Sequence, residues 1–492
     1  MSADRGTRTT SQLKGEPVGT PTSVRPEPTG NATPPQATDR VPVSEGHGLR
    51  LAWAVRSDPL PLLIRLNREH GPVVRLRVPR RPVFLISDPD AVQEALQRTH
   101  HGYEKGWGRR GDPDSPAAQP LVRALGQGLI TSGAQLHRRQ RRLIQPMFHR
   151  AQIDAYAASF VELTEAALSR WRDGELRDLR RDMSELTLAI VARTVLDVEL
   201  DAAIVDTIRT SLARDQATVR RSTTLWGQVL NRLPVPSNRR LSESLRDVNT
   251  AIYELIAARR AAGVPGTDLL SLLLSARDED TGEPMPDKLV RDEALTLLLP
   301  GHETTANALT WALYLLANHP AEQDRVREEL ACLDGPATAA DLPRLRYTTA
   351  VVHESMRLYP PVWTLLRHLS EERTIGGYRL PAGATLLLSP WVVQRDPRWW
   401  PEPDTFRPQR WLAPDATPHR FAYFPFGGGP RQCIGNDFAM TEDTLVLATI
   451  LRRWQLRAPE GAPPVRPLAQ VTLHPRDSVQ LSIHLVNSAP TP

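Results

Sequence analysis

The chain has two cysteines, and one of them, Cys433, lies in the stretch PFGGGPRQCIGNDFAM at residues 425–440. Three consecutive glycines at 427–429 permit a tight loop with backbone dihedrals that other residues avoid. From Gly435 onward apolar residues recur at helical spacing, so we expect a helix to begin just after the cysteine. Backbone N–H groups and the helix dipole at such an N-terminus favour a thiolate. A thiolate held there is a good ligand for a soft metal centre, and the alternative is a buried structural cysteine.

A second group of polar side chains lies inside an apolar helix predicted from Asp287 to about residue 319. The stretch PGHETTANALTW at 300–311 places Glu303, Thr304 and Thr305 between apolar turns. Polar side chains in such surroundings need partners, and a threonine can donate to the carbonyl four residues earlier and bend the helix. A kinked core helix with satisfied hydroxyls therefore explains the pattern without any catalytic role.

Two further helical stretches place charged side chains on one face. Glu354 and Arg357, in HESMRLYPP, are three residues apart and can form an ion pair, which contributes little stability if it is exposed. His137 and Arg141, in GAQLHRRQRRLIQPMF, are four residues apart and share a face. The neighbouring arginines either attract an acidic partner or form a solvated face. These neighbours are Arg138, Arg139 and Arg142.

The elements that must position these residues follow from the pattern of apolar residues. An amphipathic segment from Leu51, interrupted at Pro59 and Pro61, is expected to end at Gly71. Alternation over 73–87 predicts a β-hairpin, and the next helix has Asp88 as its expected N-cap. Residues 101–134 are expected to form a long irregular loop that contains a short helix.

The remainder of the chain is predicted to be helix-rich with small sheets. Helical patterns dominate from 137 to 262, with breaks at Pro146, at Gly174 and over 233–238. Further helices are predicted over 267–277, 287–318 and 340–358. Beyond Pro360 short strand-like stretches alternate with turns, and residues 468–486 resemble a terminal hairpin. The fold class is therefore α+β, mainly α.

Composition excludes several classes of protein. Hydrophobic content of 40% and charged content of 24% are those of an ordinary globular chain. Two cysteines exclude a disulfide framework and fit a reducing compartment. No stretch approaches the roughly 18 to 20 apolar residues that span a bilayer, so we expect a cytoplasmic protein without a membrane anchor. The Pro-, Thr- and Ser-rich residues 1–45 are expected to be disordered, and 489–492 form a short tail.

The cysteine loop fits the pattern F-x-x-G-x-R-x-C-x-G and resembles the haem-binding loop of the cytochrome P450 family. The stretch at 300–305 is similar to the family's oxygen-binding motif, Ala/Gly-Gly-x-Asp/Glu-Thr-Thr, although Pro300 replaces the usual Ala or Gly. Pro300 cannot donate to the carbonyl of Thr296, so the placement of the following residues is in question. The resemblance covers about residues 48 to 487 and implies a single domain over 46–488. It also implies the family's triangular, mostly helical fold, with a long central helix over the haem.

The resemblance assigns roles to individual residues. Cys433 would be the proximal thiolate ligand of the iron of haem b, within a loop that includes Phe426 and Gly435. Glu303 and Thr304 would form the acid–alcohol pair that relays protons for oxygen activation. The haem propionates would be bound by His137, Arg141, Arg367 and Arg431. A structural brace would consist of Glu354, Arg357 and Arg410. Residues facing the substrate would be Leu298, Pro300, Gly301, Val362, Trp363 and Leu365, with the 101–130 loop and the turn at 471–473.

The function implied by this resemblance is monooxygenation that depends on O2 and NAD(P)H, the electrons passing through a ferredoxin and a ferredoxin reductase. The apolar lining predicts a hydrophobic small-molecule substrate of terpenoid, polyketide or fatty acyl type, in bacterial secondary metabolism. We expect a monomer that binds no nucleic acid. The alternatives are a haem-thiolate enzyme that uses peroxide, a haem-binding sensor or carrier without turnover, and a basic nucleic-acid-binding module. The last would rest on the arginine run at 137–143 and the net charge of +5.

Overall fold

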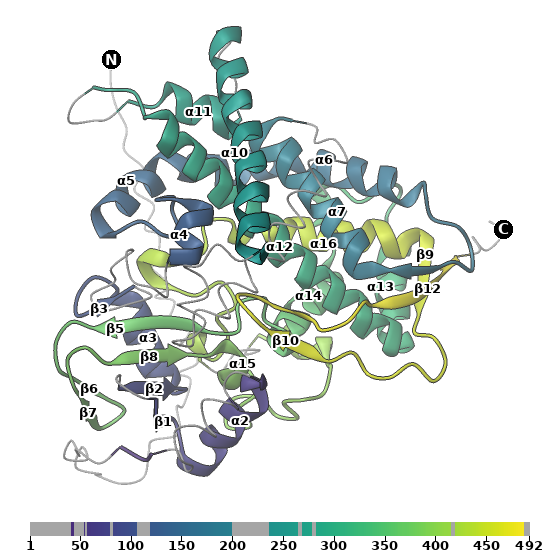
Figure 1. Ribbon diagram of the computed structural model, residues 1–492. Helices are drawn as coiled ribbons and strands as arrows, with labels where there is room; N and C mark the ends of the chain where they lie inside the picture. Colours follow the sequence, from purple (N-terminus) through teal and green to yellow (C-terminus); the bar gives the residue numbers. More distant parts are fainter. Residues whose placement is uncertain are drawn as a thin grey trace, which may run out of the picture.

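The computed structural model of the protein describes residues 41–43, 54, 57–78, 82–105, 119–198, 236–263, 268–277, 282–414 and 419–486. The predicted terminal tails lie outside these residues, apart from 41–43, as do residues 106–118 of the predicted irregular loop. Most of the helices gather on one side of the molecule and a five-stranded sheet lies on the other (Figure 1). The predicted fold class, mainly α with small sheets, is confirmed.

The larger sheet has the strand order β1-β2-β8-β5-β3. Its strands are β1 (Val73–Leu76), β2 (Val83–Ile86), β3 (Tyr103–Glu104), β5 (Leu365–Leu369) and β8 (Thr385–Leu388). The predicted hairpin is confirmed, because β1 and β2 pair antiparallel. Strand β2 also pairs in parallel with β8, which brings the two halves of the chain together.

The helix before this sheet, α2 (Pro59–His70), begins at Pro59 and ends before Gly71. The expected interruption is confirmed at Pro59, since Ala54 and Ser57 are helical and Asp58 is not, whereas Pro61 lies inside α2. Proline is tolerated in a first helical turn, where its missing N–H would have had no partner. Helix α3 (Pro89–Gln97) follows the sheet as predicted, and its N-cap Asp88 accepts a hydrogen bond from the backbone N–H of Ala91 at 3.0 Å.

The middle of the chain is helical. The predicted breaks at Pro146 and Gly174 are confirmed: Pro146 lies in a 3-10 turn, η2 (Gln145–Phe148), and Gly174 has a φ of 73° between a helix and a strand. Of the break predicted over 233–238, residues 236–238 are helical and the rest lie outside the described residues. The elements here are α4 (Gln119–Leu125), α5 (Ala134–Ile144), α6 (Arg150–Leu168), β4 (Leu176–Asp178), α7 (Leu179–Val191), η3 (Ala192–Leu196), α10 (Pro236–Ala262), α11 (Leu269–Ser275) and α12 (Asp287–Asn318). Helix α12 has the predicted bounds and continues through Pro300.

The carboxy-terminal part combines helices with short strands. Its helices are α13 (Pro320–Ala331), η4 (Ala339–Asp341), α14 (Arg346–Leu358), α15 (Pro390–Val393), η5 (Pro408–Leu412), η6 (Arg420–Ala422), η7 (Gly429–Arg431) and α16 (Asn436–Arg453). Its remaining strands are β6 (Arg373–Ile375), β7 (Tyr378–Leu380), β9 (Trp454–Arg457), β10 (Pro467–Ala469), β11 (Leu473–Pro475) and β12 (Gln480–Leu485). Helix α13 was missed by the sequence analysis, and α14 begins later than predicted.

The predicted terminal hairpin is correct only in its first half. Strands β10 and β11 pair antiparallel around a short turn. Strand β12 instead pairs with β4 and β9. The apolar alternation of these residues does not specify which strand is the partner, so the error is one of pairing rather than of strand content.

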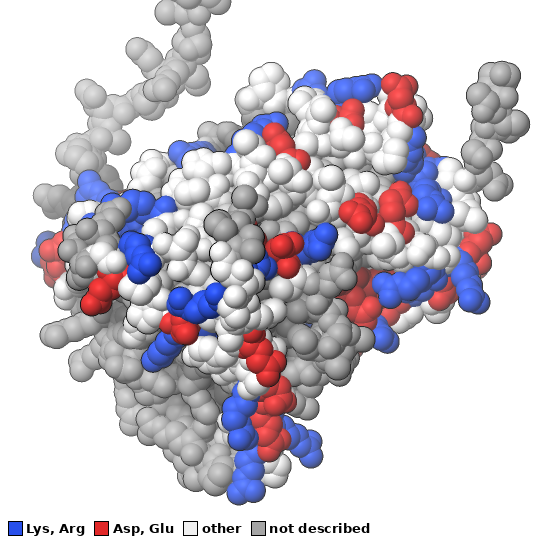
Figure 2. Space-filling view, turned by 90° about the horizontal axis from the view of Figure 1, so that it is seen from above, with Lys and Arg blue, Asp and Glu red and all other residues white. Residues whose placement is uncertain are grey.

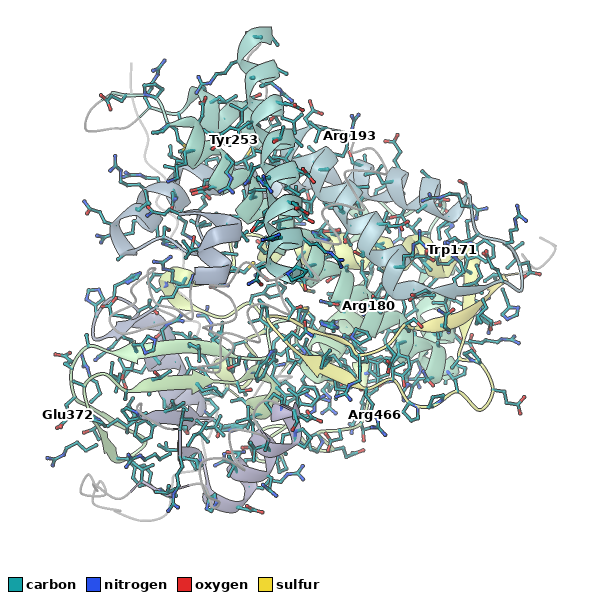
Figure 3. All side chains as sticks on the ribbon, viewed as in Figure 1. Trp171, Arg180, Arg193, Tyr253, Glu372 and Arg466 are labelled. Atoms are coloured by element: carbon teal, nitrogen blue, oxygen red, sulfur yellow. The ribbon has the colours of Figure 1, made fainter. Side chains whose placement is uncertain are left out.

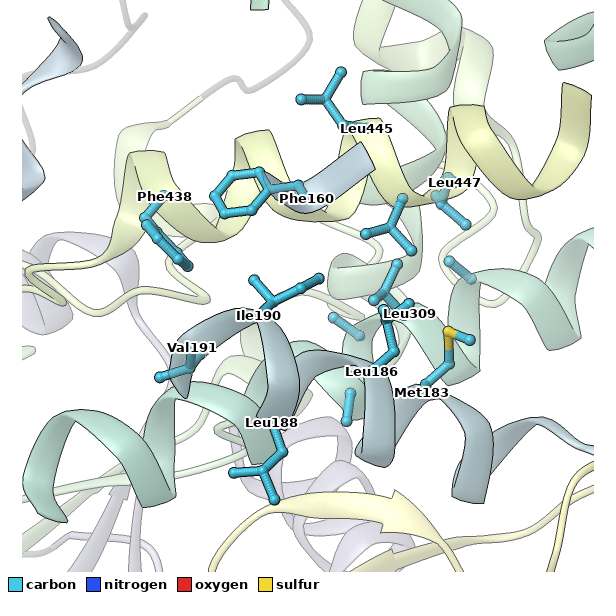
Figure 4. Packing of buried hydrophobic residues seen from close by; sticks show 14 of the residues in the cluster. Phe160, Met183, Leu186, Leu188, Ile190, Val191, Leu309, Phe438, Leu445 and Leu447 are labelled. Carbon is cyan, nitrogen blue, oxygen red and sulfur yellow. The ribbon is translucent and has the colours of Figure 1, made fainter. Parts of the chain in front are cut away.

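The main hydrophobic core lies where α6, α7, α12 and α16 pack together (Figure 4). Phe160 of α6 and Phe438 of α16 meet edge to face, with ring centroids 5.0 Å apart. Leu309 of α12 faces Leu186 and Met183 of α7. This packing surrounds α12 with other helices over much of its length, so its polar residues near Pro300 are held in a fixed place. None of the described helices is long and apolar enough to cross a membrane.

Candidate haem-thiolate site

The loop before α16 holds Cys433 through backbone contacts. The N–H of Cys433 donates to the carbonyl of Phe426 at 3.0 Å, which closes the loop. Gly429 has a φ of 66°, and a Cβ there would lie 2.1 Å from the carbonyl oxygen of Leu96 in α3. Only glycine can therefore bring the loop so close to α3. The predicted tight loop and the helix that begins just after the cysteine are confirmed.

The Cys433 side chain is accessible to solvent, yet protein surrounds it closely enough to raise the pKa of its thiol. Burial is the larger effect, and it outweighs the Gly435 N–H and the charge of Arg141, which both lower this pKa. Coordination to a metal deprotonates a thiol outright.

Positively charged side chains converge near this loop. His137 and Arg367 are buried, while Arg141 and Arg431 are partly exposed. Arg431 donates to the carbonyl of Ser132 at 2.8 Å, and Arg141 donates to the carbonyl of Gln432 at 2.7 Å. Burial, together with the charges of Arg431 and other cations, lowers the pKa of His137 to about 3. His137 is therefore neutral at physiological pH.

Two members of this basic cluster were not found from the sequence. Lys105 donates to the carbonyl of Ile130, and burial together with Arg431 and Arg367 holds its pKa well below the usual range. His100 accepts a hydrogen bond from Arg431 on Nε2 at 3.3 Å, so its Nδ1 carries the proton toward Glu104. Both residues flank a short strand in a stretch predicted as loop, and no spacing there marked them as ligands.

The centre of α12 presents polar groups on one partly exposed face. The hydroxyl of Thr304 donates to the carbonyl of Pro300 at 3.0 Å, as expected for a threonine in an apolar helix. The carboxyl of Glu303 accepts a hydrogen bond from the hydroxyl of Thr472 at 2.6 Å. Thr472 lies in the turn between β10 and β11, far from Glu303 in sequence, so periodicity gave no sign of this contact.

The Glu354–Arg357 pair is completely buried, with both side chains 0% exposed. Glu354 accepts two hydrogen bonds from Arg357, each at 2.9 Å, one from Arg410 at 3.0 Å and one from Trp411 at 2.8 Å. The expected structural brace is thus assembled as a buried network. Spacing alone could not distinguish it from an exposed pair of little energetic value.

The residues expected to face the substrate fall into two groups. Pro300, Gly301, Val362, Trp363 and Leu365 are all partly exposed. Leu298 is only 1% exposed and belongs to the main core, so it was wrongly placed. The open face of α12 instead includes Leu297, because positions 297, 300, 301 and 304 share one side of a helix.

An open hollow of about 450 Å³ lies beside the cysteine loop, between α5 and Pro430. Its lining includes Arg138, Arg141 and Arg142. Positive and negative side chains are interspersed on the face of the molecule seen in Figure 2, so net charge alone does not define a binding surface there.

Together these residues fit an anionic iron porphyrin. Cys433 supplies one soft ligand, and no group of three or more His, Cys, Asp or Glu side chains in the described part of the chain could hold a metal ion by itself. In the basic cluster, neighbouring basic side chains lower one another's pKa values. The nearby carboxylate of Glu104 acts in the opposite direction on His100 and Arg431. Two carboxylates of a bound porphyrin would neutralise this charge.

Comparison with known proteins agrees with this geometry. The family model "Cytochrome P450" matches residues 47–482. The chain is 40% identical to cyclooctatin synthase of Streptomyces melanosporofaciens over 435 residues, which are 87% of this chain and 91% of that protein. It is 36% identical to cyclooctat-9-en-7-ol 5-monooxygenase of the same organism over 82% of this chain and 86% of that protein.

A solved structure shows the same fold. The crystal structure of CYP175A1 from Thermus thermophilus matches with a TM-score of 0.70 and 31% identity, over 89% of this chain and 98% of that one. The family binds haem b and receives electrons from NAD(P)H through redox partners. The chain belongs to the cytochrome P450 family and is a bacterial-type haem-thiolate monooxygenase.

Proposed function

We propose that a single domain over residues 46–488 inserts one oxygen atom into a terpenoid, with electrons supplied by a ferredoxin and its reductase. The similarity to cyclooctatin synthase and to cyclooctat-9-en-7-ol 5-monooxygenase carries the choice of substrate class. The partly exposed side chains of Val362, Trp363 and Leu365 support it, because they offer an apolar surface without charge.

Haem supplies the redox and oxygen chemistry when it is bound. In this proposal the chain contributes the thiolate of Cys433 and the cations that hold the two carboxylates of the cofactor. His137, Arg141, Arg367 and Arg431 serve as those cationic or hydrogen-bonding partners, together with Lys105.

Proton delivery is assigned to Glu303 and Thr304. Since the hydroxyl hydrogen of Thr304 is donated to the carbonyl of Pro300, its oxygen keeps lone pairs that can accept a hydrogen bond from water or substrate. Glu303 is the adjacent acid on the same partly exposed stretch of α12. A carboxyl group and a hydroxyl group at neighbouring positions can pass a proton inward from solvent.

Electron delivery is assigned to the surface around α5. Arg138 and Arg142 are exposed there, beside the hollow next to Pro430. Positive side chains on this surface favour an acidic partner such as a ferredoxin and raise the rate of encounter at low salt. The double charge reversal Arg138→Glu with Arg142→Glu is expected to slow ferredoxin-supported reduction and leave reduction by dithionite unchanged.

Two measurements test the proposal as a whole. Titration with cyclooctat-9-en-7-ol is expected to give a low- to high-spin shift in the haem spectrum. Turnover under ¹⁸O2 with NADPH, ferredoxin and reductase is expected to place one labelled oxygen atom in the product. Turnover that needs only peroxide and incorporates no label from O2 would contradict it.

A further inference from the structure

The turn between β10 and β11 is a junction between segments that are distant in sequence. The indole N–H of Trp363 donates to the carbonyl of Gln470 at 2.8 Å. On the other side of the turn, the backbone N–H of Leu473 donates to the carbonyl of Pro361 at 2.8 Å. The turn is therefore fixed at both ends to the segment that carries Val362 and Trp363. Strand β11 also packs against α12.

The hydroxyl of Thr472 connects this junction to α12. It donates to Oε1 of Glu303 at 2.6 Å and accepts from Nδ2 of Asn307 at 3.4 Å. Glu303 and Asn307 are one helical turn apart, so both lie on the face of α12 that meets the turn. Thr472 is 6% exposed and Asn307 4% exposed, which shields these hydrogen bonds from competing water.

We propose that Thr472 is a positioning residue that holds the carboxyl of Glu303 for proton transfer and links it to the substrate-facing turn at 470–473. This inference rests on the proposed role of Glu303. A hydroxyl that donates to one carboxyl oxygen restrains the orientation of the glutamate side chain. A glutamate has three rotatable side-chain bonds, so its orientation is not set by the helix alone.

Two surrounding features support this role. The charge of Arg180 of α7, labelled in Figure 3, interacts with that of Glu303. Asp178 and Asp477 also interact with Arg180, so Glu303 shares that positive charge with two competing carboxylates. The Thr472 hydroxyl adds a directional hydrogen bond to this shared electrostatic interaction. Val471, the adjacent residue, is partly exposed, so a bound substrate that moves the turn also moves the hydroxyl.

The test compares three variants in the full haem-loaded protein, with cyclooctat-9-en-7-ol as the probe substrate. Thr472→Val removes the hydroxyl but keeps the shape, and Thr472→Ser restores it. Thr310→Val is the matched control, because this buried threonine of α12 donates only to the carbonyl of Ala306. Product and hydrogen peroxide are each measured per NADPH consumed.

Thr472→Val is expected to lower product per NADPH by about tenfold, the effect of losing one hydrogen bond to a charged group. Hydrogen peroxide per NADPH is expected to rise correspondingly. The Kd of the probe substrate, measured from the spin shift, is expected to stay within about twofold of that of the unaltered protein, because the turn keeps its backbone contacts. Thr472→Ser is expected to recover most of the coupling, and Thr310→Val to retain all of it. Full coupling in Thr472→Val would overturn the inference.

A double variant separates this inference from the proposed function. In the Glu303→Gln background, Thr472→Val is expected to cause no further loss of coupling. An equal loss in both backgrounds would show that Thr472 does not act through Glu303. Full coupling in Glu303→Gln alone would instead overturn the proton-relay role of Glu303.

A spectroscopic measurement does not depend on turnover. The infrared band of the Glu303 carboxyl, assigned by its absence in Glu303→Gln, is expected to shift in Thr472→Val and to keep its position in Thr472→Ser. An unshifted band in Thr472→Val would overturn the inference even if no probe substrate binds.

Discussion

The backbone N–H of Leu129 donates to Oε2 of Glu293 at 3.0 Å, across 164 positions of sequence. Next to it, the N–H of Gln127 donates to Asp292 at 2.8 Å. Segment 126–132 therefore lies directly on α12. In the same segment, the carbonyls of Leu129 and Ser132 accept hydrogen bonds from Arg431. The segment therefore joins the helix that carries Glu303 to the basic cluster.

Replacing Glu293 tests how this contact depends on pH. Burial is the main cause that raises the pKa of Glu293 to about 8; the charge of Asp292 adds to this rise and the Leu129 N–H opposes it. In the unfolded chain the Glu293 carboxyl releases its proton near the ordinary pKa of a glutamate, whereas in the folded protein it keeps the proton up to about pH 8. Its ionisation therefore lowers the stability of the folded protein as the pH rises between these two values. Glu293→Gln is expected to raise the Tm at pH 9 by a few degrees and to change it little at pH 5. Calorimetry at both values checks this, and a difference that does not vary with pH would contradict it.

Replacing Lys105 tests whether the basic cluster binds the cofactor. Lys105→Met removes one cation and is expected to weaken haem binding by about tenfold, the effect of one charged hydrogen bond. Lys288→Met is the control, because Lys288 is an exposed lysine near the start of α12. The rate of haem transfer to apomyoglobin measures the effect. Equal rates for the two variants would show that Lys105 does not hold the cofactor.

Replacing Glu354 tests the buried brace. Glu354→Ala leaves Arg357 buried without its carboxylate and is expected to reduce the free energy of unfolding by about 3 to 5 kcal/mol. Glu185→Ala, which breaks the exposed pair with Arg181, is expected to cost at most about 1 kcal/mol. Denaturant titration compares the two. Should Glu354→Ala fail to fold, Glu354→Gln retains an acceptor and is expected to show an intermediate loss. Equal costs for the Glu354 and Glu185 variants would contradict the network's importance.

Replacing Pro300 tests its proposed part in oxygen activation. Pro300→Ala restores an N–H that can reach the carbonyl of Thr296, and it shifts the carbonyl to which Thr304 donates. Haem content is expected to stay the same while the share of electrons that end in product changes. The ratio of product to NADPH measures it, and an unchanged ratio would remove Pro300 from the mechanism.

Local features of the site were predictable from sequence. Glycine spacing specified the cysteine loop, and the apolar period of α12 gave its bounds although it contains Pro300. These features depend on residues close together in the chain, where dihedral preference and periodicity act directly.

Contacts between distant segments were not predictable from sequence. The hydrogen bond from Thr472 to Glu303 depends on how the β10–β11 turn meets α12. The burial of Leu298 rather than Leu297 depends on which side of the helix the core occupies. Lys105 joins the basic cluster only because its short strand pairs with β5, next to Arg367. Tertiary packing decides each of these positions.

Thiolate ligation of haem by Cys433 is the central claim, and the carbon monoxide difference spectrum of the reduced protein tests it most directly. The unaltered protein is expected to show the red-shifted Soret band of a thiolate-bound haem. Cys433→Ser is expected to lose this band. Cys332→Ser, which replaces the chain's other cysteine, an exposed one, is expected to keep it. A red-shifted band that persists in Cys433→Ser would contradict the account.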